Sequence, residues 1–154
     1  MLLVRYGVPG EASDIARLIN DAFRSERFFI DEDRIDVARV LELCGQGRFL
    51  VTEEKRALTG CVYVEVRGDR GYFGLLAVAQ DQQRQGLGSR LIERAEEECR
   101  SAGCNFMDLT IVNLRTELPE YYGRFGYQEI GVEPFPAAER AKLPCHLVRM
   151  SKRL

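Results

Sequence analysis

The chain of 154 residues has few of the side chains that bind metals. It contains one histidine, no tryptophan and five cysteines, and it has no Cys-x-x-Cys pair. Zinc sites need a cluster of four ligands, and disulfide frameworks need an even number of cysteines. We therefore expect no metal site, and we interpret the cysteines as small core residues. The adjacent pair Cys145 and His146 is also interpreted as structural, because neighbouring residues in a strand point to opposite faces.

Long apolar runs and a one-sided charge are missing as well. No run approaches the roughly 18 apolar residues that span a bilayer, and residues 1–6 lack the basic region and apolar stretch of a signal peptide. Charges of both signs are interspersed and sum to −2, so no basic stripe is present for a nucleic-acid backbone. We expect a cytoplasmic protein with no membrane or nucleic-acid partner, built as a single domain over residues 1–154.

Hydrophobic periodicity predicts strands that alternate with helices. These elements are marked by apolar residues at the spacing of a helix face, or by short apolar runs bounded by glycine and proline. Helices are expected over residues 15–23, 33–44, 87–102 and 118–124, and strands over residues 2–6, 49–52, 61–66, 72–78, 106–112, 127–132 and 146–150. Because the strand at 106–112 follows a strand and a helix, it should lie parallel to the strand at 72–78.

A glycine-bearing turn separates the strand at 72–78 from the long helix. Residues 83–88 are Gln-Arg-Gln-Gly-Leu-Gly, and the two glycines allow a ligand to approach the backbone closely. Free N–H groups and the positive end of the helix dipole favour an anion such as a phosphate at this place. A turn that only reverses the chain is an equally good interpretation of this segment by itself. The P-loop and dinucleotide-binding patterns do not fit, because the Gly-Lys pair of the first and the third glycine of the second are missing.

Two segments together resemble the GNAT superfamily of acyl-CoA-dependent N-acetyltransferases. Gln83, Gly86 and Gly88 match the family's Gln/Arg-x-x-Gly-x-Gly/Ala turn, which holds the pyrophosphate of coenzyme A. Asn113 and the run from Tyr121 to Tyr127 resemble a second family segment, with a small insertion after the asparagine. The resemblance covers nearly the whole chain and implies an α/β (α+β) fold. In that fold a mixed, mostly antiparallel sheet of about six to seven strands is flanked by about four helices, and the central parallel strands splay apart.

The resemblance also implies the residues of a site. Acetyl-CoA or coenzyme A would bind as co-substrate without a metal, and Tyr122 would be the general acid that protonates the leaving thiolate. A backbone N–H of the strand at 75–78 would stabilise the tetrahedral oxyanion. The residues expected at the coenzyme are Leu76, Ala77, Val78, Gln83, Arg84, Gln85, Gly86, Leu87, Gly88, Ser89, Asn113 and Tyr122.

The expected acceptor is a primary amine of a small molecule or peptide. Direct transfer in a ternary complex is expected, because no activated nucleophile indicates a covalent intermediate. The candidates to line the acceptor pocket are Phe28, Phe29, Ile30 and Phe135, with packing over the core as the other interpretation. No general base is assigned, because Glu65, Asp108, Glu129 and His146 are each interpreted as structural, and a water relay stays open.

Two other functional classes remain compatible with these patterns. One is a non-catalytic acyl-CoA-binding or sensing domain of the same fold, and the other is an interaction module whose glycine turn binds nothing. Transfer of acetyl to a panel of amines distinguishes the first from an enzyme, and binding of coenzyme A distinguishes the second. A homodimer is possible by resemblance, although no feature of the sequence specifies it.

Overall fold

The computed structural model describes residues 3–83 and 86–154, and this part of the chain contains one mixed sheet of seven strands. The strand order is β1-β2-β3-β4-β5-β7-β6, and only β4 and β5 pair in parallel. The elements are β1 (Val4–Tyr6), α1 (Ala12–Ala22), α2 (Val37–Cys44), β2 (Arg48–Glu54), β3 (Ala57–Arg67), β4 (Arg70–Val78), α3 (Leu87–Ser101), β5 (Phe106–Val112), α4 (Leu118–Gly123), β6 (Gln128–Pro134) and β7 (His146–Arg153), with short 3-10 turns η1 (Pro9–Glu11), η2 (Phe23–Glu26), η3 (Gln80–Gln82) and η4 (Ala138–Arg140). The expected mixed fold is confirmed.

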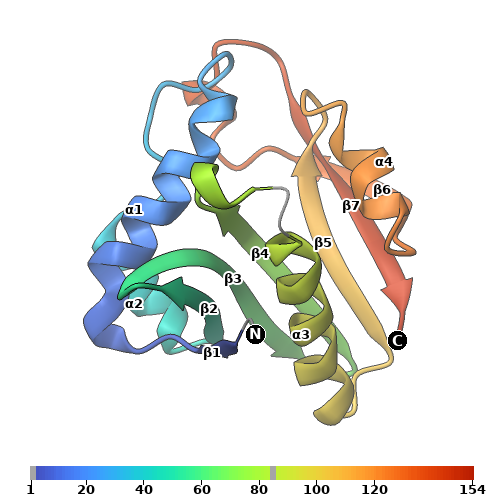
Figure 1. Cartoon of the computed structure of the whole chain (residues 1–154). Coiled ribbons are helices and arrows are strands. Elements are labelled where there is room, and N and C mark those ends of the chain that lie inside the picture. The colour runs from blue at the N-terminus through green and yellow to red at the C-terminus, as the bar shows by residue number, and fades with distance from the viewer. Residues whose placement is uncertain (1–2, 84–85) are drawn as a thin grey trace.

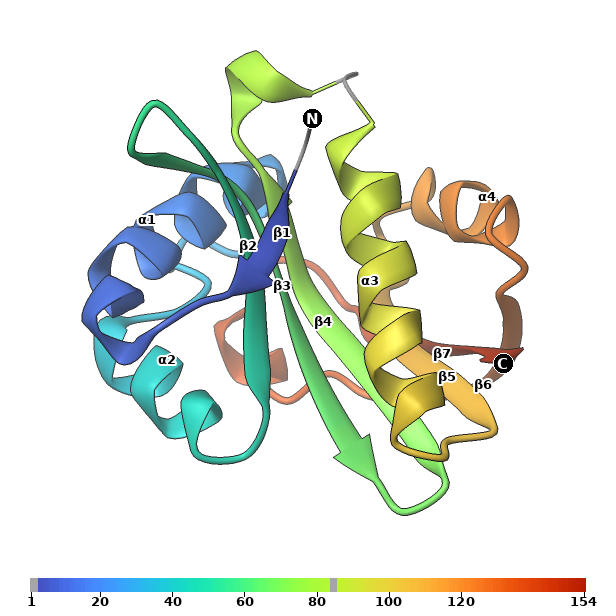
Figure 2. The same ribbon diagram turned by 60° about the horizontal axis from the view of Figure 1, so that its bottom comes forward.

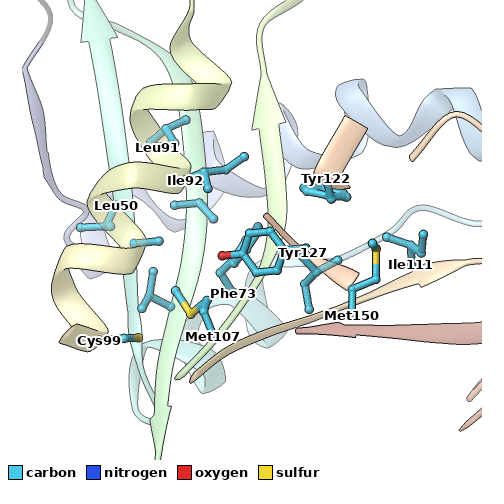
Figure 3. Close-up of a cluster of buried hydrophobic side chains, with 14 of the residues drawn as sticks. Leu50, Phe73, Leu91, Ile92, Cys99, Met107, Ile111, Tyr122, Tyr127 and Met150 are labelled. Carbon is cyan, nitrogen blue, oxygen red and sulfur yellow. The ribbon is translucent and has the colours of Figure 1, made fainter. Parts of the chain in front are cut away.

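Helices cover both faces of this sheet. Figures 1 and 2 show α1 and α2 on one side, and α3 and α4 on the other. Because successive strand residues point to opposite faces, β3 and β4 supply side chains to two separate cores. On the α3 side, Phe73, Leu91 and Met107 belong to one buried cluster (Figure 3). On the α1 side, Ile15 and Tyr63 belong to the other.

The parallel strands β4 and β5 separate after a short paired stretch. Their register runs only from the pair Arg70 and Phe106 to the pair Tyr72 and Asp108. Beyond this point β4 continues to pair with β3 up to Val78, and β5 continues to pair with β7. Figure 1 shows the two strands diverging toward their carboxyl ends. The splay that the resemblance implies is therefore present, because each strand follows a different neighbour.

An ion pair joins β4 and β5 where the two strands are still paired. The Arg70 guanidinium donates through Nε to Asp108 Oδ2 at 2.7 Å and through Nη2 to Oδ1 at 2.8 Å, and Ser151 Oγ lies 2.6 Å from the same Oδ1. Burial alone would raise the pKa of Asp108, but the hydrogen bonds from Arg70 and Ser151 outweigh it and lower the pKa. Asp108 is thus a structural carboxylate that joins β4, β5 and β7.

Two predicted boundaries are wrong by four residues. The strand predicted over residues 61–66 begins at Ala57, and the second helix begins at Val37 rather than at residue 33. Asp36 caps it, since its Oδ1 accepts a hydrogen bond of 2.8 Å from the backbone N–H of Arg39. The residues just before Asp36 are therefore outside the helix and form an irregular segment.

Two features are absent from the described part of the chain: a membrane-spanning helix and a cluster of metal ligands. Within residues 3–83 and 86–154, no helix is long and apolar enough to cross a bilayer. The same residues contain no group of three or more histidine, cysteine or carboxylate side chains placed to hold a metal ion. All five cysteines are free thiols, and Cys61, Cys99 and Cys104 are buried in the core.

Candidate functional site

The glycine turn begins α3 in a conformation that requires glycine. Gly86 is the N-cap residue, with φ +78° and ψ 12°, and its carbonyl accepts the first helical hydrogen bond from Arg90 N. A side chain at this φ would be strained, although there is open space around the Cα atom. At Gly88, an added Cβ would lie 2.8 Å from the Tyr121 hydroxyl oxygen. Glycine is therefore favoured at the two positions for different reasons: by the backbone conformation at Gly86 and by the lack of space for a side chain at Gly88.

The turn is tied back to the end of β4. Gln83 donates from Nε2 to the Val78 carbonyl at 3.2 Å. Arg84 and Gln85, which were expected at the coenzyme, lie outside the described residues. The next residues, Gly86 to Ser89, line a cavity, and the amino end of the 15-residue helix α3 faces it. This end of a helix carries free N–H groups and partial positive charge, which suit an anion.

The cavity has a volume of about 1060 Å³ and passes between the splayed strands. Its wall contains Phe73 and Tyr122 from the α3 side of the sheet, and Phe23 and Tyr72 from the α1 side. A closed sheet would separate these two sets of side chains. Ligand sites in proteins commonly range from 300 to about 1000 Å³, so this cavity is large enough for a long cofactor and a second molecule.

A bulge in β4 lies where the cavity passes through the sheet. Gly74 pairs with Tyr63 and Ala77 with Cys61, so β4 has one residue more than β3 over this interval. Leu75 has φ +55°, an uncommon conformation for a non-glycine residue. Leu75 and Leu76 leave the regular ladder and line the cavity, as do Ala77 and Val78. Backbone groups along this edge can therefore bind a ligand rather than a strand.

Tyr122 lies on α4 at the wall of the same cavity. Its ring packs edge-on against Phe73 and Tyr127, with centroids 6.0 and 6.4 Å away, and is only 8% exposed (Figure 3). Burial raises the pKa of this phenol above its ordinary value near 10, and the neighbouring charge of Arg115 offsets only part of that rise. The hydroxyl thus keeps its proton at neutral pH and can act as an acid.

Asn113 does not line the cavity. Its Oδ1 accepts a hydrogen bond of 2.8 Å from the backbone N–H of His146, and its own N–H donates to the His146 carbonyl at 3.0 Å. These bonds join the end of β5 to the start of β7. The structure therefore gives Asn113 a role in closing the sheet, and contact with a coenzyme stays a prediction for this residue.

The predicted acceptor residues divide into two pairs. Ile30 and Phe135 line the cavity. Phe28 and Phe29 do not: the first is 50% exposed, and the second is fully buried against the Phe135 ring at 6.2 Å, so acceptor contact stays a prediction for both. The Phe29 carbonyl also accepts a hydrogen bond of 2.6 Å from Lys142 N. Phe29 therefore packs behind the cavity wall, where it contacts the lining residue Phe135.

The charged residues of the cavity wall, among them Glu26, Arg34 and Arg115, were not predicted from the sequence. Glu26, at the end of η2, is buried, and its Oε2 lies 3.0 Å from Arg115 Nη1. Burial raises the pKa of Glu26, and the charges of Arg115 and Arg34 oppose this rise. Both arginines line the cavity as well. The sequence contains a signal only for the neighbouring segments: Glu26 lies two residues before the predicted pocket residues Phe28 to Ile30, and Arg115 lies in the insertion after Asn113.

The comparisons with known proteins agree with this geometry. A family model described as an acetyltransferase (GNAT) domain matches residues 19–154. The chain is 32% identical over 118 residues to the amino-acid acetyltransferase of Azotobacter vinelandii, which covers 74% of this chain and 26% of that protein. It is 31% identical over 86 residues to a rice (Oryza sativa subsp. japonica) protein named as a probable glucosamine 6-phosphate N-acetyltransferase 2, which covers 53% of this chain and 50% of that protein. The chain thus spans half or less of the length of these relatives.

Solved structures show the same fold. The ribosomal-protein-S18-alanine N-acetyltransferase of Escherichia coli superposes with a TM-score of 0.79 at 15% identity, over 99% of this chain and 94% of that one. The structure of yncA from Salmonella typhimurium, solved with its cofactor acetyl-CoA, superposes with a TM-score of 0.74 at 20% identity, over 99% and 94% of the two chains. At these identities the likeness concerns the fold. With the family model matching most of its length, the chain belongs to the GNAT acetyltransferase domain family.

Proposed function

We propose that this chain is an N-acetyltransferase that moves the acetyl group of acetyl-CoA directly to a primary amine of a small molecule or peptide. One observation carries the proposal: a single cavity connects the amino end of α3, the bulged edge of β4 and the Tyr122 phenol across the splayed strands. Anion binding, backbone pairing and proton donation are thereby available along one continuous path.

The coenzyme fits the amino end of α3. Free N–H groups from Gly86 to Ser89 would bind the pyrophosphate, and Gly88 leaves room that a Cβ beside Tyr121 would fill. Gln83 holds this turn against β4, and Arg84 and Gln85 complete the proposed turn. The bulged edge of β4, over Leu76, Ala77 and Val78, would pair with the pantetheine arm.

The residues of the cavity fit the chemistry of acetyl transfer. The acetyl thioester supplies the electrophilic carbonyl when bound. A backbone N–H of the β4 bulge would stabilise the negative charge that develops on the carbonyl oxygen as the C–N bond forms. Tyr122 would give its proton to the sulfur as the C–S bond breaks, and the amine would lose one proton to a base.

Titration calorimetry with acetyl-CoA tests the binding part of the proposal. We expect a dissociation constant in the low micromolar range or tighter for the wild type, and loss of binding in Gly86→Glu, because a carboxylate would occupy the phosphate site. Gly68→Glu is a matched control, because Gly68 has a similar φ of +67° and open surroundings in the turn between β3 and β4, away from the cavity. Unchanged affinity in Gly86→Glu would overturn this assignment of the turn.

Acetyl transfer to a panel of amines tests the catalytic part. An acyl-CoA-binding domain without catalysis would bind acetyl-CoA and acetylate none of them. An enzyme releases free coenzyme A in proportion to the amine consumed, which a thiol reagent measures directly.

A further inference from the structure

We propose that the acceptor is a primary amine with an adjacent free carboxylate, as in an α-amino acid, whose ammonium contacts Glu26 and whose carboxylate contacts Arg34. This assignment rests on the proposed acetyl transfer and names the acceptor for the same cavity. Both side chains line the end of the cavity on the α1 side of the sheet, so two opposite charges are offered to one bound molecule.

Glu26 has one oxygen engaged and one available. Within residues 3–83 and 86–154, the side-chain donor that reaches the Glu26 carboxylate is Arg115, at Oε2. Oε1 is thus left for the acceptor ammonium. Glu26, Arg115 and Tyr122 all line the same cavity, and the charge of Arg115 acts on both the Glu26 carboxylate and the Tyr122 phenol. Glu26 is therefore buried in the wall of the cavity that also contains the proposed acid.

Arg34 is the cation of this wall that the fold does not neutralise. Among the residues that the structure describes, no carboxylate oxygen lies within 4 Å of its guanidinium, which instead lies 5.5 Å from the centre of the Phe23 ring. The other arginines of the wall have carboxylate partners: Arg115 pairs with Glu26 and Glu117, Arg140 with Glu32, and Arg39 with Glu42. An acceptor carboxylate would give Arg34 its partner.

Two segments distant in sequence contact each other beside the Glu26 end of the cavity. Lys142 donates from its backbone N–H to the Phe29 carbonyl, and its Nζ lies 2.9 Å from Asp31 Oδ1. These contacts bind the loop before β7 to the segment between η2 and α2. The wall also contains Glu32 and Asp33, which pair with Arg140 and Arg27, and Asp36, which caps α2. A small zwitterion suits a wall where Glu26 has one oxygen available and the Arg34 guanidinium has no carboxylate partner among the described residues.

Glu26 would then act on the bound ammonium. Its carboxylate takes one proton from the ammonium, and the neutral nitrogen attacks the thioester carbonyl to form the C–N bond. Collapse of the tetrahedral intermediate breaks the C–S bond, and the thiolate takes the Tyr122 proton. The nitrogen then loses its second proton, which restores the Tyr122 phenol through solvent. Burial raises the pKa of Glu26 above that of an ordinary glutamate, which makes it a better proton acceptor. The products are the N-acetyl amino acid, coenzyme A and one proton, which Glu26 releases to solvent.

The test compares free L-amino acids with their α-amides and with the matching decarboxylated amines, each with acetyl-CoA. In the wild type, kcat/KM should be at least about tenfold higher for the best free acid than for its amide, the loss expected for one charge-assisted hydrogen bond. Arg34→Gln should lower kcat/KM for the free acid by about tenfold to a hundredfold and leave the amide nearly unchanged, so that the preference disappears. Arg24→Gln is the matched control, because Arg24 is exposed and pairs with Asp21 outside the cavity.

Glu26→Gln separates the two contacts. It should lower kcat for free acids and amides alike, because both carry the ammonium, while acetyl-CoA affinity stays within about twofold. The acceptor assignment is overturned if wild-type enzyme acetylates amides or plain amines as fast as free acids, or if Arg34→Gln keeps the preference. Binding of acetyl-CoA without transfer to any amine would instead overturn the proposed function, and the acceptor assignment with it.

Discussion

Replacing Tyr122 with phenylalanine would remove one hydroxyl from the cavity and keep the ring that α4 packs into the core. The ring contacts with Phe73, Tyr121 and Tyr127 involve carbon atoms that phenylalanine also has. Within the described part of the chain, no hydrogen bond ties the Tyr122 hydroxyl to another residue. The free energy of unfolding should therefore change by less than about 0.5 kcal/mol.

The effect on catalysis should be much larger than the effect on stability. General acids contribute about 10²- to 10⁴-fold to rates. A thiol with a pKa near 8.5 is already a fair leaving group at neutral pH, so the lower end of that range applies to Tyr122. We expect kcat to fall about 100-fold, or about 2.7 kcal/mol in activation free energy.

Steady-state kinetics and calorimetry on the same protein samples check this prediction. Tyr121→Phe is the natural control, because Tyr121 is the neighbouring residue and also lines the cavity, but its hydroxyl lies beside Gly88 at the start of α3. We expect Tyr121→Phe to change KM for acetyl-CoA more than kcat. A Tyr122→Phe variant with kcat within threefold of the wild type would refute the role of this phenol as the acid.

The remaining predictions concern the framework around the site. Asp36→Ala should lower the free energy of unfolding by about 1 kcal/mol in urea titration, because the first turn of α2 loses its cap at Arg39 N. Phe29→Ala should cost about 3–5 kcal/mol, since the ring is fully buried; a cost below 1 kcal/mol would contradict its packing role. Asp108, whose pKa is lowered in the folded state, contributes stability that is complete above about pH 4 and is lost as the pH falls below it. Asp108→Asn should therefore flatten the pH dependence of unfolding in that acidic window, and an unchanged slope would show that the Arg70 pair contributes nothing.

Local patterns were enough to locate most elements and the glycine turn before α3. Helix α3 is visible in the sequence because its buried residues recur at helical spacing, and Gly86 is visible because only glycine accepts its φ at no cost. The same reasoning failed at the start of α2. There the first residue of the helix is set by the cap that the Asp36 side chain provides, and not by the apolar spacing. Such signals depend on residues within a few positions of each other.

The acceptor end of the site could not be read in the same way. Glu26 and Arg115 are 89 positions apart, and nothing near either residue indicates that they meet in a buried ion pair. Phe29 lies behind the cavity wall, and the sequence alone does not separate that place from the lining, since an aromatic residue in an irregular segment can pack behind a cavity or line it. Contacts between side chains far apart in the sequence depend on how the whole sheet and its two helical layers pack.

The sequence by itself determined the mixed fold, the glycine turn that begins α3 and the place of Tyr122 on a short helix after β5, because each follows from backbone preference and periodic burial. Only the tertiary structure decided that β4 and β5 part after Tyr72, that β4 bulges at Leu75, and that one cavity crosses the sheet there. The physical reason is that each splayed strand gains its hydrogen bonds from a different neighbour, and that choice is made by packing across the whole sheet.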